Sequence, residues 1–299
     1  MKLIILGTSS MVPTKERNVS SQYLEFKGEG ILFDCGEGTQ RQMNIAGINR
    51  HKVKKILITH WHGDHVSGLV GLIQTLGNKE GGHSLSVFGP KGTKQKMKHL
   101  LNSCSFENKV KIKIKELDAK DLKLFYENED YMLQAINVYH SIPVVGYRFV
   151  EKDKRKVNMQ KLKKLGVNEG PHIKKLQEGK DIEYKGKEYK AKDFTSVVKG
   201  KVFVFIPDTT YGPNCIKIAK NADVLLCEGT YANDLIEKAK ERKHLTAREA
   251  AQIASQADVK RLILTHFSQR YKDPKEILED AKEVFPKAEA AFDFMKVSF

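Results

Sequence analysis

The sequence lacks the features that mark secreted and membrane-spanning proteins. Its four cysteines show no C-x-x-C spacing and no disulfide-like framework, so we expect reduced thiols. No apolar run approaches the roughly 20 residues that are needed to cross a bilayer. The apolar run Leu3–Leu6 is too short for the core of a signal peptide. These absences predict a soluble protein of the cytoplasm that has no membrane partner.

Acidic residues are outnumbered by basic ones, 37 to 52, which gives the 299-residue chain a formal net charge of +15. Such a balance favours a polyanionic partner, either nucleic acid or an anionic membrane surface. A lysine-rich proteome would raise the charge equally without any partner, and the composition leaves that alternative open. The segment 151–192 holds 14 basic and 7 acidic residues and shows little aliphatic periodicity. We therefore expect it to be an excursion from the core.

The rest of the chain alternates between expected strands and helices. Strands are expected at 2–6, 21–26, 31–33, 55–58, 85–88, 110–115, 131–139, 144–150, 202–206, 223–227, 261–265 and 290–297. Helices are expected up to about residue 48 and at 65–76, 91–101, 214–221, 232–242, 246–256 and 274–285. Alternation of strands that are apolar on both faces with helices predicts an α/β fold in which helices cover the sheets.

A dense cluster of metal-binding residue types follows the apolar run 56–58. Residues 60–65 read H-W-H-G-D-H and bring three imidazoles and a carboxylate into six positions. Nitrogen and oxygen ligands at the end of a buried strand suit zinc. His60 and His62, two residues apart, can share one metal, and Asp64 and His65 can reach a second one beside it. A polar loop that happens to hold histidines is the alternative, and this density argues against it.

Three further candidates stand at the ends of other expected strands: His140, Asp208 and His266. Each of them alone would more often be a packing or capping residue than a ligand. The segments 54–60 and 260–266 read K-K-I-L-I-T-H and K-R-L-I-L-T-H, so each is a buried strand that delivers a histidine. This internal similarity predicts two similar halves that face one site.

The H-x-H-x-D-H pattern after a buried strand resembles the signature of the metallo-β-lactamase superfamily, which hydrolyses lactams, thioesters, phosphodiesters and other bonds. The resemblance implies an αββα sandwich of two mixed sheets, with 1–299 as one domain and 151–192 as an inserted, protruding, flexible basic arm. It implies two Zn²⁺ per subunit, with Mn²⁺ as a possible substitute. The ligands that it implies are His60, His62 and His140 for one ion, Asp64, His65 and His266 for the other, and Asp208 between the two. Asp64 would also accept a proton.

Four features together are similar to the short form of the ribonuclease Z family, which removes 3′ trailers from precursor tRNA. They are the loop P-T-K-E-R-N at 13–18, the block F-D-C-G-E-G-T-Q at 33–40, the H-L-T box at 244–246, and the basic insertion with Gly-Val at 166–167 and Gly-Pro at 170–171. This resemblance implies a precursor tRNA substrate, a 3′-hydroxyl on the tRNA, a 5′-phosphate on the trailer and a homodimer. The substrate-binding residues that it implies are Lys15, Arg17, Asn18, Gly170 and Pro171.

His244 has two interpretations. It could be a surface histidine beside a helix that Thr246 caps together with Glu249 three residues later. It could also be the general acid that protonates the leaving oxygen, held charged and oriented by Glu228. We favour the second interpretation, mainly because the H-L-T box resembles the family's catalytic box.

Two other classes of function remain as alternatives. One is another hydrolase of the superfamily, such as an arylsulfatase-like enzyme or a different phosphodiesterase, and it would lack a basic arm. The other is a non-catalytic RNA-binding protein on the same scaffold, which predicts eroded ligands. The candidate ligands are all present in this sequence, and so is the basic segment 151–192.

Overall fold

The computed structural model describes residues 1–78 and 80–299, which divide into two compact units. The larger unit comprises Met1–Tyr126, Leu133–Phe149 and Val202–Phe299. The smaller unit comprises Glu127–Met132 and Val150–Lys201. In the described part of the chain, no helix is long and apolar enough to span a membrane.

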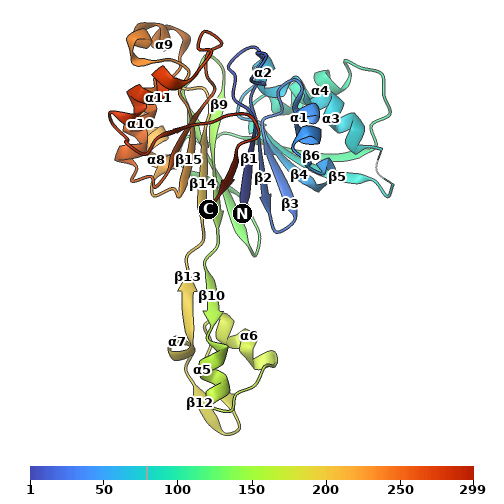
Figure 1. The fold of residues 1–299 in the computed structure, drawn as a ribbon. Coiled ribbons are helices and arrows are strands. Elements are labelled where there is room, and N and C mark those ends of the chain that lie inside the picture. Colours follow the sequence, from blue (N-terminus) through green and yellow to red (C-terminus); the bar gives the residue numbers. More distant parts are fainter. Residues whose placement is uncertain (79) are drawn as a thin grey trace. The chain divides into compact units, whose positions relative to one another are not determined.

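Two seven-stranded sheets form the larger unit (Figure 1). The first has the order β18 (Lys296–Ser298), β1 (Lys2–Gly7), β2 (Ser21–Phe26), β3 (Glu29–Phe33), β4 (Val53–Leu57), β5 (His83–Pro90) and β6 (Val110–Leu117). Its strands are antiparallel from β18 to β3 and parallel from β3 to β6. The second has the order β17 (Glu289–Ala290), β16 (Leu262–Thr265), β15 (Val224–Glu228), β14 (Val202–Ile206), β9 (Val144–Glu151), β8 (Tyr131–Val138) and β7 (Lys123–Glu127).

Aromatic side chains fill the space between the two sheets. Phe33 on β3 makes edge contacts with Phe203 and Phe205 on β14, at ring-centroid distances of 5.4 and 6.1 Å. Tyr147 on β9 also packs against Phe33, and its hydroxyl donates to the Ile58 carbonyl across the interface at 2.7 Å. Burial of such rings on both faces of the contact is the main stabilising term for a sandwich of this kind.

Helices cover the outer faces through two further apolar clusters. The elements on the side of the first sheet are α1 (Thr39–Ile45), η1 (Arg50–Lys52), α2 (Gly63–Val66), α3 (Leu69–Leu76) and α4 (Thr93–Leu101). Those on the side of the second sheet are α8 (Pro213–Ala219), η2 (Asn233–Leu235), α9 (Ile236–Arg242), α10 (Ala247–Gln256) and α11 (Lys275–Lys282). The predicted αββα sandwich of two mixed sheets is confirmed.

Three predicted elements of the larger unit are wrong, and strand β7 was not predicted. The helix expected at 232–242 is a 3-10 turn, η2, followed by the shorter helix α9. The strand expected at 290–297 is two short strands in different sheets, because Phe294 takes a left-handed φ of 70° and the chain crosses from β17 to β18. The helix expected at 65–76 is split into α2 and α3 at Gly68, whose N–H donates to the Cys35 carbonyl. A Cβ on Gly68 would lie 2.2 Å from the Gly36 carbonyl oxygen, so the split requires glycine there.

The smaller unit has its own core. Strands β10 (Lys154–Val157) and β13 (Thr195–Val198) pair antiparallel, and the other elements of this unit lie between them in the sequence. These elements are α5 (Met159–Lys164), α6 (Pro171–Gln177), β11 (Ile182–Tyr184), β12 (Lys187–Tyr189) and α7 (Ala191–Phe194). Its buried side chains are Leu162, Val167, Leu176, Ile182, Tyr189, Ala191 and Phe194. These apolar residues are widely spaced in the sequence, which explains why no helical or strand period was evident.

Candidate dinuclear metal site

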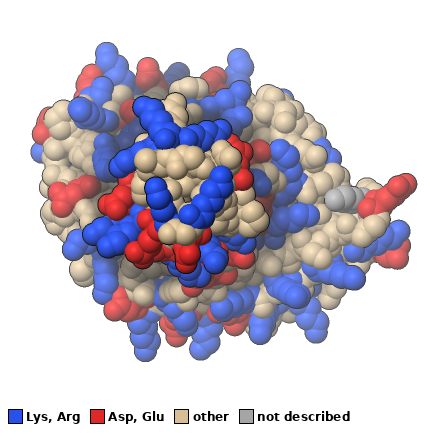
Figure 2. All heavy atoms as spheres, turned by 90° about the horizontal axis from the view of Figure 1, so that it is seen from below, with Lys and Arg blue, Asp and Glu red and all other residues tan. Residues whose placement is uncertain are grey.

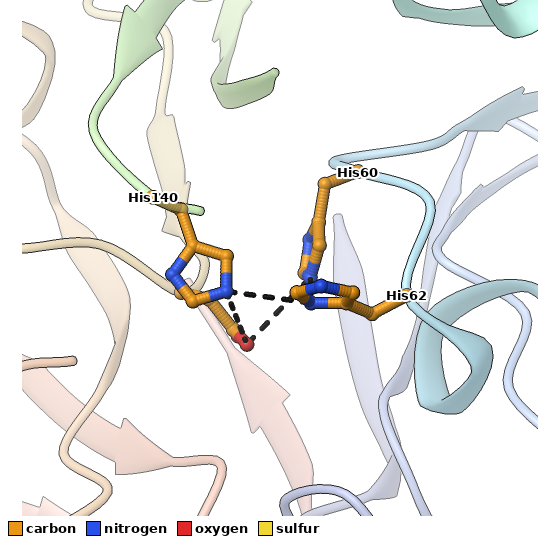
Figure 3. A group of neighbouring side chains, drawn as sticks. His60, His62 and His140 are labelled. Atoms are coloured by element: carbon orange, nitrogen blue, oxygen red, sulfur yellow. Dashed lines mark hydrogen bonds and ion pairs between the residues drawn. The ribbon is translucent and has the colours of Figure 1, made fainter. Parts of the chain in front are cut away.

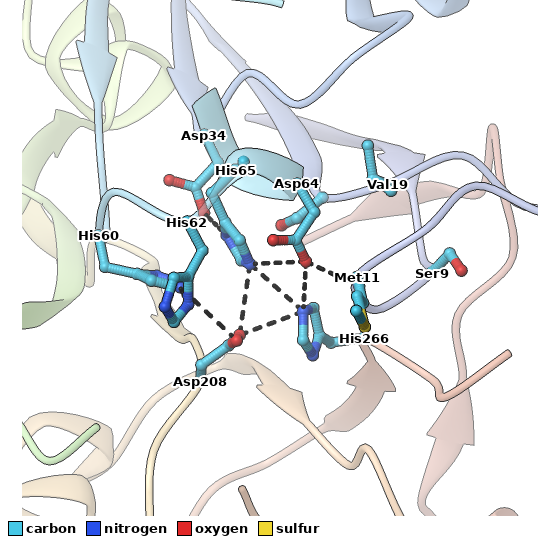
Figure 4. A network of polar contacts seen from close by, with 12 residues as sticks. Ser9, Met11, Val19, Asp34, His60, His62, Asp64, His65, Asp208 and His266 are labelled. Atoms are coloured by element: carbon cyan, nitrogen blue, oxygen red, sulfur yellow. Dashed lines mark hydrogen bonds and ion pairs between the residues drawn. The ribbon is translucent and has the colours of Figure 1, made fainter. Parts of the chain in front are cut away.

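The predicted ligands converge at one edge of the sandwich, where strands of both sheets end. His60 and His62 follow β4, Asp64 and His65 lie on α2, and Asp208 follows β14. The turn after β8 supplies His140, and the residue directly after β16 is His266. The structure therefore brings all seven predicted ligands into one network of contacts, most of which Figure 4 shows.

The first cluster consists of His60, His62, His140 and Asp208. The Nδ1 atom of His62 lies 3.0 Å from His60 Nε2 and 3.3 Å from His140 Nε2 (Figure 3). Two nitrogens bound to one tetrahedral zinc are about 3.3–3.4 Å apart, given zinc–nitrogen bonds of about 2.0–2.1 Å. Asp208 Oδ2 is 3.6 Å from His60 Nε2. The nitrogens therefore have the separations of a metal-binding set.

The second cluster consists of Asp64, His65 and His266, and Asp208 borders it as well. The Nε2 atoms of His65 and His266 are 3.3 Å apart. Asp64 Oδ2 lies 3.4 Å from His266 Nε2 and 3.5 Å from His65 Nε2. Asp208 Oδ1 is 3.2 Å from His266 Nε2, whereas its other oxygen faces the first cluster. One carboxylate thus lies between the two groups of ligands.

Outer hydrogen bonds fix the proton on Nδ1 of two histidines directly. His65 Nδ1 is 2.7 Å from the carboxylate of Asp34, which can only accept when ionised. His140 Nδ1 is 2.9 Å from the backbone carbonyl of Lys243, which also accepts. In each neutral ring the lone pair is then on Nε2, the atom that faces the cluster. Carboxylate and carbonyl partners of this kind orient metal-binding histidines.

Two threonines fix the proton on Nδ1 of His60 and His266, which follow strands β4 and β16. The Thr59 hydroxyl donates to Asp34 at 2.8 Å, so its oxygen accepts from His60 Nδ1 at 3.0 Å. The Thr230 hydroxyl donates to Glu228, so its oxygen accepts from His266 Nδ1 at 3.0 Å. Four imidazoles consequently present lone pairs to the two clusters, where they cannot satisfy one another by hydrogen bonds.

The carboxylates, like the imidazoles, are not satisfied by hydrogen bonds within the clusters. They are suited to binding cations instead. Asp208 Oδ1 is buried and accepts no hydrogen bond from any residue that the structure describes. Burial raises the pKa of Asp208 and of Asp64, but the surrounding histidines outweigh burial and hold both pKa values below their usual range. Burial lowers the pKa of His60 well below its ordinary value, which favours the neutral ligand form. Burial also lowers the pKa of His65, but the carboxylates of Asp208, Asp64 and Asp34 outweigh burial and raise it well above its ordinary value. Buried anions beside imidazole nitrogens fit two divalent metal ions, whose binding releases the protons of the ligands.

His244 lies beside the clusters and is held by Glu228. Its Nδ1 is 3.1 Å from Glu228 Oε2, and Glu228 is fully buried. Burial lowers the pKa of His244, but the Glu228 carboxylate more than offsets this and raises it to about 9. Thr246 also caps α10 in a capping box with Glu249. The two interpretations of His244 are therefore compatible, because capping uses Thr246 and leaves the imidazole at the site.

Residues with a left-handed backbone surround the site. Asp34, Lys243 and His266 have φ of 57°, 57° and 62°, and Met11 has φ of 66°. Met11 donates its N–H to Asp64 Oδ2 at 2.8 Å. Non-glycine residues rarely adopt this region, and such strain is concentrated at functional sites. The roles of five residues were not evident from the sequence, where only the motif block 33–40 pointed to one of them: Asp34, Thr59, Thr230, Lys243 and Met11.

The predicted substrate-binding residues fall in four different environments. Lys15 is exposed. Arg17 is buried, and its guanidinium donates to the carbonyls of Tyr271 and Ser268. Asn18 donates from its side chain to the Glu37 carbonyl and from its N–H to Asp293. Gly170 and Pro171 begin α6 in the smaller unit. Substrate binding by these five residues stays a prediction.

Comparison with known proteins gives consistent relatives over nearly the whole chain. Ribonuclease Z of Clostridium tetani is 38% identical over 308 residues, covering 99% of this chain and 97% of that protein. Ribonuclease Z of Methanothermobacter thermautotrophicus is 39% identical, covering 99% and 96%. The crystal structure of the short form of human tRNase Z superposes with a TM-score of 0.73 at 26% identity, covering 100% of this chain and 99% of that one.

Two family models also match parts of the chain. A model described as the anti-Pycsar protein Apyc1 matches residues 1–142, and a model of the beta-lactamase superfamily domain matches residues 182–267. The His/Asp clusters described above are typical of the dinuclear metal site of that superfamily.

Proposed function

Because this chain belongs to the ribonuclease Z family of tRNA 3′-processing endonucleases, we propose that it cleaves the 3′ trailer from precursor tRNA at the His/Asp clusters. The products are a tRNA with a 3′-hydroxyl and a trailer with a 5′-phosphate. The observation that carries this proposal is the complete set of seven ligands with outer hydrogen bonds that aim their lone pairs inward. An RNA-binding protein without catalysis has no need of that set.

Each residue has a defined part in the proposed reaction. His60, His62 and His140 would hold one zinc ion, Asp64, His65 and His266 would hold the other, and Asp208 would contribute to both. When bound, two zinc ions lower the pKa of water towards about 7 and neutralise charge on a phosphoryl oxygen. Manganese is a possible substitute.

The protein's own side chains handle the protons. Asp64 accepts a proton from the attacking water, and the Met11 N–H keeps its carboxylate in place. As the bond between phosphorus and the 3′ oxygen breaks, that oxygen needs a proton to become a hydroxyl. His244 donates it from Nε2, because its Nδ1 is engaged with Glu228. Glu228 keeps the imidazole protonated and oriented until the transfer.

The smaller unit supports RNA as the substrate. Its basic segment 151–192 carries a net charge of +7. Lys and Arg side chains are prominent on the face of the molecule shown in Figure 2. Lysine and arginine bind folded RNA mainly through phosphates and shape. An arylsulfatase-like hydrolase or another small-molecule phosphodiesterase has no use for such a unit. We also expect a homodimer, which light scattering measures.

The decisive experiment uses a precursor tRNA that carries a 3′ trailer. The purified protein is incubated with zinc and this RNA, and both new ends are mapped by sequencing and by their reactivity towards a phosphatase and a ligase. We expect one cut, a 3′-hydroxyl and a 5′-phosphate. Binding without cleavage, in a protein that has retained two zinc ions, would favour the non-catalytic alternative. Cleavage of small diesters alone would favour the other hydrolases.

A further inference from the structure

An exposed tyrosine stands beside the predicted metal ligands without a role in holding them. Tyr139 is 63% exposed, which is unusual for a large aromatic residue next to the buried His140. Its backbone is fixed on both sides, because its N–H donates to Thr209 Oγ1 at 3.1 Å and its carbonyl accepts from the Thr210 N–H at 2.9 Å. The ring is thus presented to solvent on a rigid support at the edge of the site.

Lys243 completes a pair with Tyr139. Its Nζ atom lies 5.2 Å from the centre of the tyrosine ring, a cation–π distance. Its ammonium group forms no ion pair with any residue among 1–78 and 80–299. Its backbone already has a task, since its carbonyl accepts from His140 Nδ1 and its left-handed φ of 57° allows that contact. The side chain is therefore an unneutralised cation beside an exposed aromatic ring.

We propose that Tyr139 and Lys243 bind the nucleotide that carries the leaving 3′ oxygen, with its base stacked on the tyrosine ring and a flanking phosphate held by the lysine. The proposal rests on the proposed function. An aromatic face next to a cation is the chemistry that binds unpaired nucleotides, because every base has a face that stacks and every linkage is anionic. A tyrosine that serves packing alone is usually more buried than this one.

The positions of Tyr139 and Lys243 in the chain indicate that they bind the nucleotide that carries the leaving oxygen and not the first nucleotide of the trailer. Lys243 directly precedes His244, and Tyr139 directly precedes His140, whose ring centre is 5.2 Å from that of His244. His244 is the proposed donor to the leaving oxygen. The nucleotide that owns this oxygen must approach on the side of His244, where the pair lies. Asp64 and Met11 lie on the side of the second cluster.

The test measures each protein variant with each of several modified substrates. Precursor tRNAs are made with an abasic site either just before or just after the cleaved bond, and kcat/KM is measured for wild type, Tyr139→Phe and Tyr139→Ala. We expect Tyr139→Ala to lose about 5-fold to 150-fold, the scale of one base–aromatic stack. Tyr139→Phe retains the ring and stays near wild type. The abasic site before the bond should cost wild type a similar factor and cost Tyr139→Ala almost nothing more.

Lys243→Gly tests the cation separately. Glycine adopts the left-handed φ readily, so the carbonyl contact to His140 and the zinc content should persist. We expect weaker binding of precursor tRNA and a log–log salt slope that is shallower by about 0.7–0.9, the change expected when one phosphate fewer is neutralised. Lys27→Gly is the matched control, because Lys27 also has a left-handed φ, of 49°, in the β2–β3 turn.

The outcomes separate this inference from the proposed function. If wild type cleaves precursor tRNA but the losses from Tyr139→Ala and the abasic site multiply, the stacking interaction is disproved and the endonuclease assignment stands. Zinc loss in proportion to activity in either variant would make the pair structural and would also overturn the inference. If the wild type with two zinc ions cleaves no precursor tRNA, both proposals fall together.

Discussion

Asp34 Oδ2 and His65 Nδ1 are 2.7 Å apart, and both side chains are fully buried. The other oxygen of Asp34 accepts the Thr59 N–H at 2.8 Å, so a single carboxylate ties β3 to the segment that delivers the histidines. It serves both clusters, because it orients His65 directly and His60 through the Thr59 hydroxyl.

Asp34→Asn should therefore weaken metal binding without unfolding the protein. Asparagine tolerates the left-handed φ at this position, but its amide cannot accept from the imidazole and the hydroxyl with the strength of a carboxylate. Zinc affinity is expected to fall about 10-fold to 100-fold, measured by competition with a chromogenic chelator. Asp258→Asn is the control, since exposed Asp258 has a similar φ of 52°. Equal zinc affinity in both variants would refute the role of Asp34.

Asp208→Ala should remove the carboxylate shared by the two clusters. We expect kcat/KM for precursor tRNA to fall on the order of 10²–10³-fold or more, because both ions lose a ligand and their mutual charge is no longer offset. Circular dichroism should show an intact fold. Asp121→Ala, at an exposed aspartate, serves as the control. Near-normal cleavage with two ions still bound would show that Asp208 is not shared.

His244→Ala should leave metal content and RNA affinity unchanged and slow the chemical step. The Nδ1 atom of this imidazole contacts Glu228, and His244 also lies within metal-sharing distance of Asp208 and His266, so the zinc content must be measured. Single-turnover rates should drop about 10²-fold to 10⁴-fold, the usual contribution of a general acid. His99→Ala on α4 is the matched control, because this histidine is exposed. Zinc loss that parallels the loss of rate would identify His244 as a ligand.

Removal of the smaller unit's basic part should separate RNA binding from chemistry. Lys154 and Val198 are paired across β10 and β13, so residues 154–198 can be replaced by two glycines that join Asp153 to Lys199. A cut inside the predicted bounds 151–192 would leave part of the unit's core exposed. We expect both metals and hydrolysis of a small diester to persist.

Binding of precursor tRNA by the same variant should weaken, with a salt slope that is shallower by about 0.7–0.9 for each phosphate that the protein no longer neutralises. A second variant changes the exposed residues Lys163, Lys164, Lys174 and Lys175 to glutamine and keeps the core of the unit intact. An unchanged affinity and salt slope in both variants would contradict RNA binding by this unit.

Asp293 predicts a pH dependence of stability. Burial raises its pKa from 3.8 to about 6, although Thr8 and the Asn18 N–H donate to it. The folded state therefore holds the proton more tightly than the unfolded state. The stabilisation is complete below pH of about 3.8 and is lost as pH rises through about 6, by at most about 3 kcal/mol.

Urea unfolding between pH 3.5 and 7 measures this effect. The free energy of unfolding of wild type, taken relative to Asp293→Asn, should decrease over the interval. A difference that is constant with pH, or that grows, would contradict the raised pKa of Asp293.

The metal-binding residues at the ends of strands could be predicted from the sequence, whereas the residues that hydrogen-bond to them from outside the clusters could not. The similar segments 54–60 and 260–266 correctly indicated one histidine at the end of a strand in each sheet, now His60 and His266. The partner of His266 is Thr230, which is brought beside it by the parallel register of β15 and β16, with Glu228 opposite Thr265. Register between strands that are distant in the chain is set by packing of the whole core and leaves little trace in local sequence.

The crossing of residues 291–295 from one sheet to the other has a consequence for synthesis of the protein. Asp293, within it, anchors the Asn18 N–H, and β18 pairs with β1. The loop 13–18 and the edge of the first sheet therefore cannot take their final structure until residues 293–298 have left the ribosome. His266 also emerges late. We expect a partly synthesised chain to be inactive, so a nuclease made among tRNA-laden ribosomes gains its activity only after β18 has emerged and paired with β1.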